Sequence, residues 1–457
     1  MGPDGPARAW DEDRDDAGAP RPGYAELPGA FEGRDLDELR RGIARRLERD
    51  GVTFGEEAFV VDPVPRLIDG GEWDDLAAGL AQRGRALDAL LRDAYGERAI
   101  ARAGVVSDAT IDDAEGYEPE LHGRLPTQRW PAAVIGFDIV RAPDGELLVL
   151  EDNVRTPSGF AYAVAARRVL AEEGAPSLAP CRPIEPEVWS LLDGALRAAA
   201  PAGCDEPSIL LLTDGPENSA TYEHEQVARR IDAALGTLAD ILDDGERLAV
   251  RQPDGSTRPV DVVYRRTDVD RLRDERGEPT DVAKALLVPW LEGRVGLVNG
   301  FGSGLADDKL VHGLVEDCVR FYLGEEPLVR SVPSRPVDGR LSVDELRELV
   351  IKPRAGYGGS GVVIGAHAKT ADLERLADEL DEHPERYIAQ RLLPLSRHPT
   401  VVDGRLEPRH VDLRAFAFCG DDIAVLPGGL TRVALEAGAL VVNSSQNGGG
   451  KDTRVVD

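Results

Sequence analysis

The stretch VIKPRAGYGGSGVVIG, residues 350–365, places Lys352 at the end of an apolar run and follows it with a glycine-rich segment and a second apolar run. Both runs are rich in β-branched residues and too short for a helix, so the pattern predicts a strand, a turn and a strand. Glycine permits backbone conformations that other residues resist. The sequence therefore predicts a glycine-rich β-hairpin with Lys352 on its incoming strand.

A hairpin of this kind can fold over phosphates, with backbone N–H groups facing the oxygens and a lysine beside them. The alternative is a flexible hairpin with a solvated lysine, and so short a glycine motif does not choose between the two. Lysine is scarce in this chain, which favours a role for Lys352. The five lysines are Lys284, Lys309, Lys352, Lys369 and Lys451.

A second hairpin is predicted in residues 130–159, where the apolar stretches WPAAVIGFDIV and ELLVLEDNV flank the turn residues PDG. Glu151 and Asn153 are two residues apart on one strand and so share a face, and Asp138 faces them from the paired strand. Three hard oxygen ligands in one cluster suit Mg²⁺, with substrate phosphates and waters completing its coordination. A solvated acidic strand end is the alternative interpretation.

Composition limits the classes of protein to consider. A chain of 457 residues exceeds what one hydrophobic core usually supports, so two or three domains are expected. The net charge of −30 argues against nucleic acid or an anionic membrane as a partner, and no apolar run approaches the length of a membrane span. The four cysteines have no CxxC spacing, which argues against a zinc site and favours a reducing cytoplasm. The acidic residues 1–27, rich in Asp, Gly and Pro, predict a disordered tail.

Helical periodicity is found in residues 32–50 and 74–96. Beyond a linker near residue 185, SILLLTDG at 208–215, YEHEQVARRIDAAL and VDVVYRRTD predict a strand, a helix and a strand of an α/β unit. A metalloprotease HExxH motif is excluded at His224 and Glu225, because Ala228 stands where the second histidine is required. The stretch 297–323 predicts a strand, a tight glycine turn and a helix that begins at Asp308 and Lys309.

The segment from residue 331 contains alternating strands such as DLRAFAF and LVVNSSQ, whose polar members share a face. Several of these side chains are candidates for binding a polyanion. They are Arg414, Arg432, Asn443, Gln446 and Lys451.

Four separated motifs, FDIVRAPDGELLVLEDNVRTPSG, VIKPRAGYGGSGV, IAQRLLPLSRHPT and VLPGGLTRVA…NSSQNGGGKDT, resemble those of the circularly permuted type 2 ATP-grasp proteins. The layout is similar to that of the synthetase domain of glutathionylspermidine synthase, from about residue 28 to 457. The resemblance implies an α+β fold, a circularly permuted ATP-grasp with an inserted α/β (pre-ATP-grasp-like) domain. The expected parts are 28–189 with the metal hairpin, 190–330 as the α/β domain, and 331–457 with the phosphate hairpin.

Carried over to this sequence, the resemblance implies ATP and Mg²⁺ as cofactors. Lys352 would bind ATP, Gly358, Gly359 and Gly361 would form the phosphate lid, and Gln390 would lie at the adenine. The implied Mg²⁺ ligands are Asp138, Glu151 and Asn153. Glutathionylspermidine synthase has an arginine where Gly136 stands here, so the phosphate charge must be met elsewhere. The candidates for this catalytic role are Arg155, Arg414 and Arg432.

The predicted function is an ATP-dependent carboxylate–amine ligase that forms an acyl phosphate and releases ADP and phosphate. No covalent nucleophile is needed, in agreement with the lack of a Ser/His/Asp or Cys/His arrangement in the sequence. The substrates would be small-molecule or peptide carboxylates and amines, and the resemblance also suggests alpha-E and transglutaminase-like proteins as partners. A catalytically silent nucleotide- or partner-binding protein and a small-molecule kinase remain as alternatives.

Overall fold

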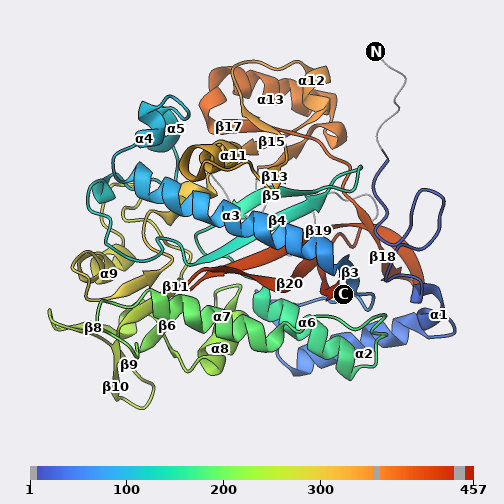
Figure 1. Ribbon diagram of the computed structural model, residues 1–457, viewed down its shortest axis with the longest axis horizontal. Helices are drawn as coiled ribbons and strands as arrows, with labels where there is room; N and C mark the ends of the chain where they lie inside the picture. The colour runs from blue at the N-terminus through green and yellow to red at the C-terminus, as the bar shows by residue number, and fades with distance from the viewer. Residues whose placement is uncertain (1–7, 355–360, 437–447) are drawn as a thin grey trace.

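The computed structural model describes residues 8–354, 361–436 and 448–457. An eight-stranded sheet forms its centre, with the strand order β13-β5-β4-β19-β20-β21-β3 and β18 paired to β19. The bounds are β3 Arg66–Asp69, β4 Val134–Arg141, β5 Leu147–Asn153, β13 Arg330–Ser331, β18 Arg397–Val402, β19 Arg405–Cys419, β20 Ile423–Val433 and β21 Gly449–Val456. Strands from both ends of the chain therefore alternate in one sheet (Figure 1).

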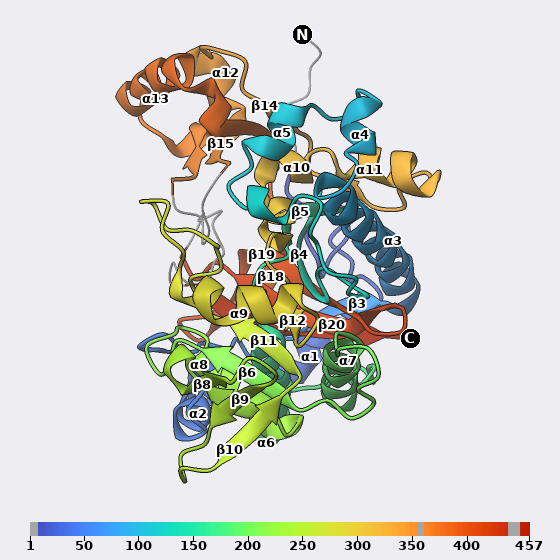
Figure 2. The same cartoon turned by 90° about the vertical axis from the view of Figure 1, so that its left-hand side faces the viewer.

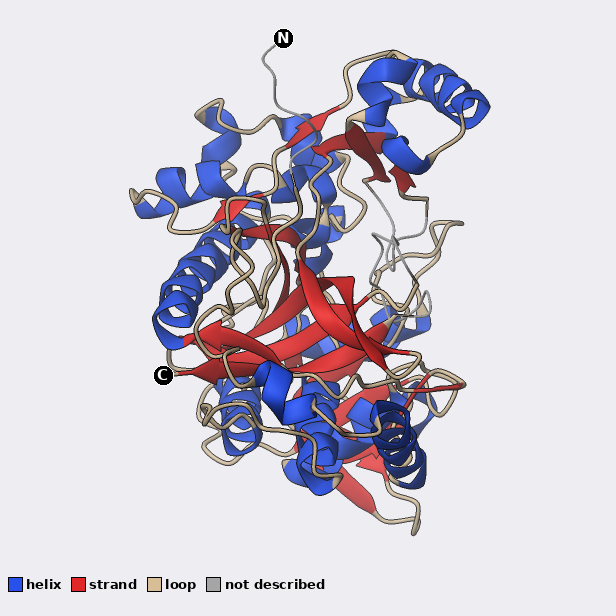
Figure 3. Ribbon diagram, turned by 90° about the vertical axis from the view of Figure 1, so that its right-hand side faces the viewer, coloured by secondary structure: helices blue, strands red, loops and turns tan. Residues whose placement is uncertain are grey.

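Helices cover this sheet from both sides, as Figure 3 shows. The longest among the described residues is α3, Gly70–Ala94, which packs small and apolar residues against the sheet, and a Cβ added at Gly84 would lie 3.0 Å from Ile423 Cδ1. The opposite face is covered over β19, β20 and β21 by α6, Phe160–Glu172, and α7, Glu185–Ala198. The predicted helices at 32–50 and 74–96 are confirmed as α2, Leu36–Arg49, and α3.

A small separate unit contains the glycine-rich hairpin. Its sheet has the order β14-β17-β15-β16, with β14 Ser334–Pro336, β15 Leu349–Pro353, β16 Val363–Ile364 and β17 Tyr387–Arg391. The helices α12, Val343–Arg347, and α13, Thr370–Glu382, pack on one face and enclose a core of their own. The predicted hairpin is confirmed, because β15 and β16 pair antiparallel. Figure 2 shows this unit and α3 on opposite sides of β4 and β5.

The α/β unit contains a parallel sheet of order β12-β11-β6-β7. Its elements are β6 Ile209–Thr213, α8 Thr221–Arg230, β7 Ala234–Gly236, β11 Val262–Arg266, α9 Asp281–Leu291 and β12 Gly296–Val298, with an antiparallel sheet of β8 Ile241–Asp243, β9 Leu248–Arg251 and β10 Thr257–Val260. Buried residues of this unit belong to the same hydrophobic core as the large sheet. The segment 331–457 is divided between two hydrophobic cores. Its first part forms the core of the small unit, and its later strands belong to the core of the large sheet.

The expectation of a disordered tail is wrong for residues 8–27. Glu12 is buried and pairs with Arg66 at 2.5 Å and with Arg141 at 3.2 Å. The backbone of this segment also bonds to Arg397, through Glu12 N–H to the Arg397 carbonyl at 2.9 Å. The composition of the segment gave no sign of this order, because the arginines that bind Glu12 come from distant parts of the chain.

Among the described residues no helix is long and apolar enough to cross a membrane. The four cysteines form no disulfide.

Candidate functional site

The metal hairpin predicted from the sequence forms one wall of a cavity of about 390 Å³. Asp138 on β4 lies opposite Glu151 on β5, and Gly136 lies opposite Asn153. A register shift after Asp138 lets Glu151 face it although Val149 pairs with the next residue of β4. All three predicted oxygen donors, Asp138, Glu151 and Asn153, line the cavity.

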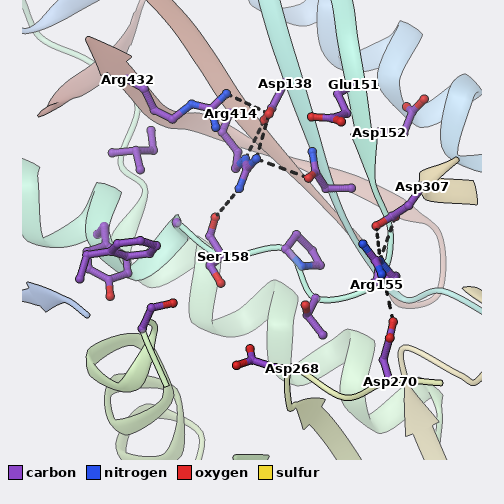
Figure 4. Close-up of a pocket in the computed structure, with 18 of the residues that line it drawn as sticks. Asp138, Glu151, Asp152, Arg155, Ser158, Asp268, Asp270, Asp307, Arg414 and Arg432 are labelled. Atoms are coloured by element: carbon purple, nitrogen blue, oxygen red, sulfur yellow. Dashed lines mark hydrogen bonds and ion pairs between the residues drawn. The ribbon is translucent and has the colours of Figure 1, made fainter. Parts of the chain in front are cut away.

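Two arginines from the neighbouring strands hold Asp138. The Arg414 guanidinium donates to both carboxylate oxygens, from Nε at 2.6 Å and from Nη2 at 2.8 Å, and Arg432 Nη2 lies 2.9 Å from Oδ2 (Figure 4). Arg432 also pairs with Asp412 at 2.5 Å. Burial alone would raise the pKa of Asp138, but the two arginines outweigh it and hold that pKa far below its ordinary value. Asp138 is therefore an ionised carboxylate although it is buried.

The donors fit Mg²⁺ to different degrees. A carboxylate offers about four lone-pair sites, and the arginines occupy three of those on Asp138, which leaves one on Oδ1. Glu151 pairs with Lys309 at 3.3 Å. Asn153 could bind a metal only through its Oδ1 atom, which accepts from Arg414 at 3.4 Å, and its Nδ2 atom is buried without a hydrogen-bond partner among the described residues. No group of three or more His, Cys, Asp or Glu side chains in the described part of the chain is arranged to hold a metal ion, so a metal here depends on Asn153 as well.

Arg155, the third predicted arginine, follows β5 and is held by carboxylates. Its Nε donates to Asp307 at 2.9 Å and lies 3.8 Å from Asp270. Asp307 also accepts the backbone N–H groups of Val154 and Arg155. Burial raises the pKa of Asp307 to about 6, with Arg155 acting in the opposite direction. Arg155 thus ties the end of the metal hairpin to residue 307.

Lys352 and Gln390 share one face of the small sheet. Lys352 lies opposite Ile388, and Val350 lies opposite Gln390; directly opposed residues in an antiparallel pair point to the same side. The other side carries Ile351 and Ala389, which belong to the core of the small unit. The Gln390 amide donates to Ser334 Oγ at 2.9 Å.

The amine of Lys352 is buried, and its pKa is affected by charged residues of the metal hairpin. Burial lowers its pKa, Glu151 and Asp138 raise it, and Lys309 lowers it further. Among the described residues no carboxylate pairs directly with Lys352. Lys352 on the small sheet is therefore close enough to Glu151 and Asp138 on the large sheet for their charges to act on it.

The predicted phosphate lid is described only in part. Gly358 and Gly359 lie outside the described residues, as do Asn443 and Gln446. Gly361 has a φ of +72°, and a Cβ there would lie 2.9 Å from Pro353 Cγ. Glycine is required at this end of the loop on both grounds.

Lys451 is not available to a polyanion. It is fully buried, and its amine pairs with Asp62 and donates to the Pro399 carbonyl at 2.9 Å. The lysine of the NGGGK motif is therefore structural. The exclusion of a metalloprotease motif agrees with the surroundings of His224, whose Nδ1 lies 2.9 Å from Thr213 Oγ1 and whose pKa burial and Arg266 lower to about 2.

Several residues of the cavity were not anticipated from the sequence. Three aspartates and three aromatic residues join the predicted ones there, namely Asp268, Asp270, Asp307, Phe54, Phe59 and Tyr162. Asp268 and Asp270 follow the carboxyl end of the parallel strand β11, and α/β sheets bind ligands at this edge. Their position after a predicted strand could therefore have indicated that they belong to the site. The aromatic residues carry no comparable signal.

A buried network supports the loop between Arg155 and α6. Glu223 on α8 accepts the backbone N–H groups of Gly159 at 2.9 Å and Ala161 at 3.0 Å. Arg266 on β11 donates to the Pro157 carbonyl and pairs with Glu223 at 3.4 Å. The α/β unit thereby fixes one edge of the cavity.

Comparison with known proteins agrees with this architecture. Residues 65–434 match the family described as circularly permuted ATP-grasp type 2. A Frankia alni protein with the provisional name glutamate–cysteine ligase 2-3 is 42% identical over 463 residues, covering 97% of this chain and 53% of that protein. An uncharacterised protein of Synechocystis sp. is 37% identical over 473 residues, covering 99% of this chain and 98% of that protein.

The chain spans about half the length of the Frankia relatives that it matches. A solved structure, that of a glutathione synthetase-like effector from Globodera pallida in its apo form, is similar with a TM-score of 0.56 and 12% identity, covering 93% of this chain and 99% of that one. That likeness concerns the fold. The metal hairpin comes before the glycine-rich hairpin in the chain, as expected of a permuted ATP-grasp protein, and the family model matches most of the chain. The chain belongs to the circularly permuted ATP-grasp type 2 family.

Proposed function

We propose that this protein is an ATP-dependent carboxylate–amine ligase that forms an acyl phosphate and releases ADP and phosphate. The observation that carries the proposal is the electrostatic contact between two groups of side chains. Lys352 and Gln390 share one face of the small sheet, Glu151, Asn153 and the Asp138–Arg414 pair belong to the large sheet, and the charges of Glu151 and Asp138 act on Lys352. The names of the Frankia relatives, which describe a ligase, support the reaction class.

Lys352 and the glycine hairpin are proposed to bind the phosphates of ATP, and Gln390 to lie at the adenine. Glu151 and Asn153 are proposed as Mg²⁺ ligands, with the remaining lone pair of Asp138 Oδ1 as a third. When bound, Mg²⁺ would supply positive charge to the phosphate oxygens during transfer. The protein's own contribution is to hold the reacting groups together and keep water from them.

The chemistry follows from the poor reactivity of a carboxylate. A carboxylate oxygen of the substrate forms a bond to the γ-phosphorus of ATP, and the bond to the ADP oxygen breaks. The amine nitrogen then attacks the acyl carbon, phosphate leaves with the bonding pair, and the amine loses a proton. Arg414 and Arg432 are proposed to donate hydrogen bonds to the oxygens that become negative, although each is also paired with a carboxylate, and Arg155 is the third candidate for that role. The cytoplasmic location and the alpha-E and transglutaminase-like partners remain part of this proposal.

The test is release of ADP by the purified protein with Mg²⁺ and ATP against pools of amino acids, small peptides and amines. ADP should form only when a carboxylate is present, and hydroxylamine should trap the acyl phosphate as a hydroxamate. AMP as the main product would contradict the ligase mechanism. A stable phosphorylated product without an amide would indicate the kinase, and no turnover with any acid would indicate the silent binding protein.

A further inference from the structure

The cavity beside the metal hairpin has two walls of different charge. Figure 4 shows Arg414 and Arg432 with Asp138 on one side, and Asp268 and Asp270 on the other. The first wall is close to neutral, since each of its arginines is paired with a carboxylate, Arg414 with Asp138 and Arg432 with Asp412. The second wall is the one with unbalanced charge.

On the second wall three carboxylates face one cation. Arg155 lies 2.9 Å from Asp307 and 3.8 Å from Asp270. Asp268 has no cation within ion-pair distance among the described residues, and its side chain accepts a hydrogen bond from the amide of Asn218 at 3.3 Å. Burial and the neighbouring Asp214 raise the pKa of Asp268, and the hydrogen bond from Asn218 and the charge of Arg266 offset this rise only in part. Ligand cations are the simplest way to offset this charge.

A second, independent feature points to a ligand in the same cavity. The buried Nδ2 of Asn153 has no acceptor among the described residues, although Asn153 lines the cavity. A buried amide donor of this kind calls for an oxygen acceptor. The cavity thus combines a donor for an acyl or phosphate oxygen near the metal hairpin with carboxylates for a cation on the opposite wall.

The space and the remaining wall fit a small organic ligand. Phe54, Phe59 and Tyr162 supply apolar surface, and the volume of about 390 Å³ lies within the usual range of small-molecule sites. A ligand with a short apolar body and a terminal ammonium would match the carboxylates and the aromatic wall, while an acyl or phosphate oxygen of the other substrate would accept from Asn153. An anionic ligand would meet repulsion from Asp268 and Asp270.

We propose that this cavity is the amine subsite and that it takes a small primary amine as its ammonium cation, held by Asp268 and Asp270. The proposal rests on the proposed function and goes beyond it by naming the charge and size of the amine substrate and the residues that select it. Asp307 and Arg155 form the back of the subsite and set the position of Asp270.

The test compares three four-carbon probes that differ only in their end groups: 1,4-diaminobutane, 1,4-butanediol and succinate. Binding to the full chain is measured by calorimetry without ATP at moderate salt. The diamine should bind at least about tenfold more tightly than the diol, since a charge-assisted hydrogen bond is stronger than a neutral one, and succinate should not bind. Asp268→Asn and Asp270→Asn should each weaken diamine binding about tenfold while leaving the diol unchanged.

The matched control is Asp232→Asn, because Asp232 is an exposed aspartate of the same α/β unit that does not line this cavity. The net charge of −30 attracts diamines to the whole surface, and this variant measures that effect. Equal weakening by Asp232→Asn, equal binding of the diol, or no saturable binding of the diamine would each overturn the proposal.

Failure of the two proposals can be told apart. Diamine binding that depends on Asp268 and Asp270, in a protein that releases no ADP with any acid and amine, would refute the ligase and leave the cation site. ADP release and amide formation with an amine whose turnover is unchanged in Asp268→Asn and Asp270→Asn would keep the ligase and refute the subsite.

Discussion

Asp138 and Arg414 lie directly opposite each other on β4 and β19 and are joined by two hydrogen bonds of 2.6 and 2.8 Å. Arg414 also lies 3.4 Å from Asn153 Oδ1, so one guanidinium contacts two of the three proposed metal ligands. This pair is where the C-terminal strands of the permuted chain meet the metal hairpin. Its integrity matters both for the fold and for the proposed chemistry.

The first prediction concerns the stability that this pair provides. Asp138→Asn removes the charge shared by Arg414 and Arg432 and leaves buried positive charge without compensation, so the free energy of unfolding should fall by about 3–5 kcal/mol. Urea unfolding followed by circular dichroism measures the change. Asp421→Asn is the control, because Asp421 is fully exposed on its pair with Arg129 and should alter stability little. A variant as stable as the parent would mean that the arginines find other partners.

A second prediction compares two buried lysines. Lys352 has a lowered pKa and no carboxylate paired directly with it among the described residues, so its charge opposes folding at neutral pH. Lys352→Met should therefore keep or raise the melting temperature while weakening ATP binding by about 1.5–3 kcal/mol. Lys451→Met should have the opposite effects. Its free energy of unfolding should fall by about 3–5 kcal/mol because Asp62 is left buried without a cation, and its ATP binding should not be weakened.

Calorimetry with ATP and thermal unfolding of both variants would check these opposite outcomes. The lowered pKa of Lys352 also has a consequence for pH dependence. As the pH rises, Lys352 loses its charge earlier than an ordinary lysine, so the loss of ATP affinity should be centred at a pH lower than the ordinary lysine pKa of 10.5. Unchanged affinity in Lys352→Met would remove Lys352 from the nucleotide site.

The features that could be predicted from the sequence are the local ones. Alternation within a few residues placed Glu151 and Asn153 on one face, and glycine-rich turns located both hairpins. Asp268 and Asp307 were not predicted as site residues, because only the tertiary fold brings them close to the metal hairpin. The prediction that Lys451 binds a polyanion was wrong. A glycine-rich stretch before a lysine suggests a phosphate loop, but Lys451 pairs with Asp62, which lies 389 residues away in the sequence.

A third prediction tests the packing of the N-terminal segment. Burial would raise the pKa of Glu12, but Arg141 and Arg66 outweigh it and lower the pKa from 4.5 to about 2. A lowered acid pKa gives stability that is present above pH 4.5 and is lost as the pH falls toward 2. Glu12→Gln should therefore cost about 3 kcal/mol at pH 7, and its difference from the parent should shrink below pH 4.5.

Urea unfolding at several pH values measures this difference, with Glu97→Gln as an exposed control. A Glu12→Gln variant that is as stable as the parent at pH 7 would indicate that residues 8–27 leave the body of the protein in solution, as their composition suggested.

The last prediction separates the two halves of the proposed nucleotide site. Glu151→Gln keeps the shape of the side chain and an oxygen that can contact Lys309 but removes the negative charge that favours Mg²⁺ binding. ATP alone should still raise the melting temperature of this variant, because Lys352 is intact, whereas the further rise on adding Mg²⁺ should disappear. Lys352→Met should lose both increments. Turnover of Glu151→Gln should fall by about 100-fold or more at saturating Mg²⁺, since the metal stabilises the charge on the transferred phosphoryl group. An intact Mg²⁺ increment together with turnover like that of the parent would make the hairpin structural and favour a silent nucleotide-binding protein.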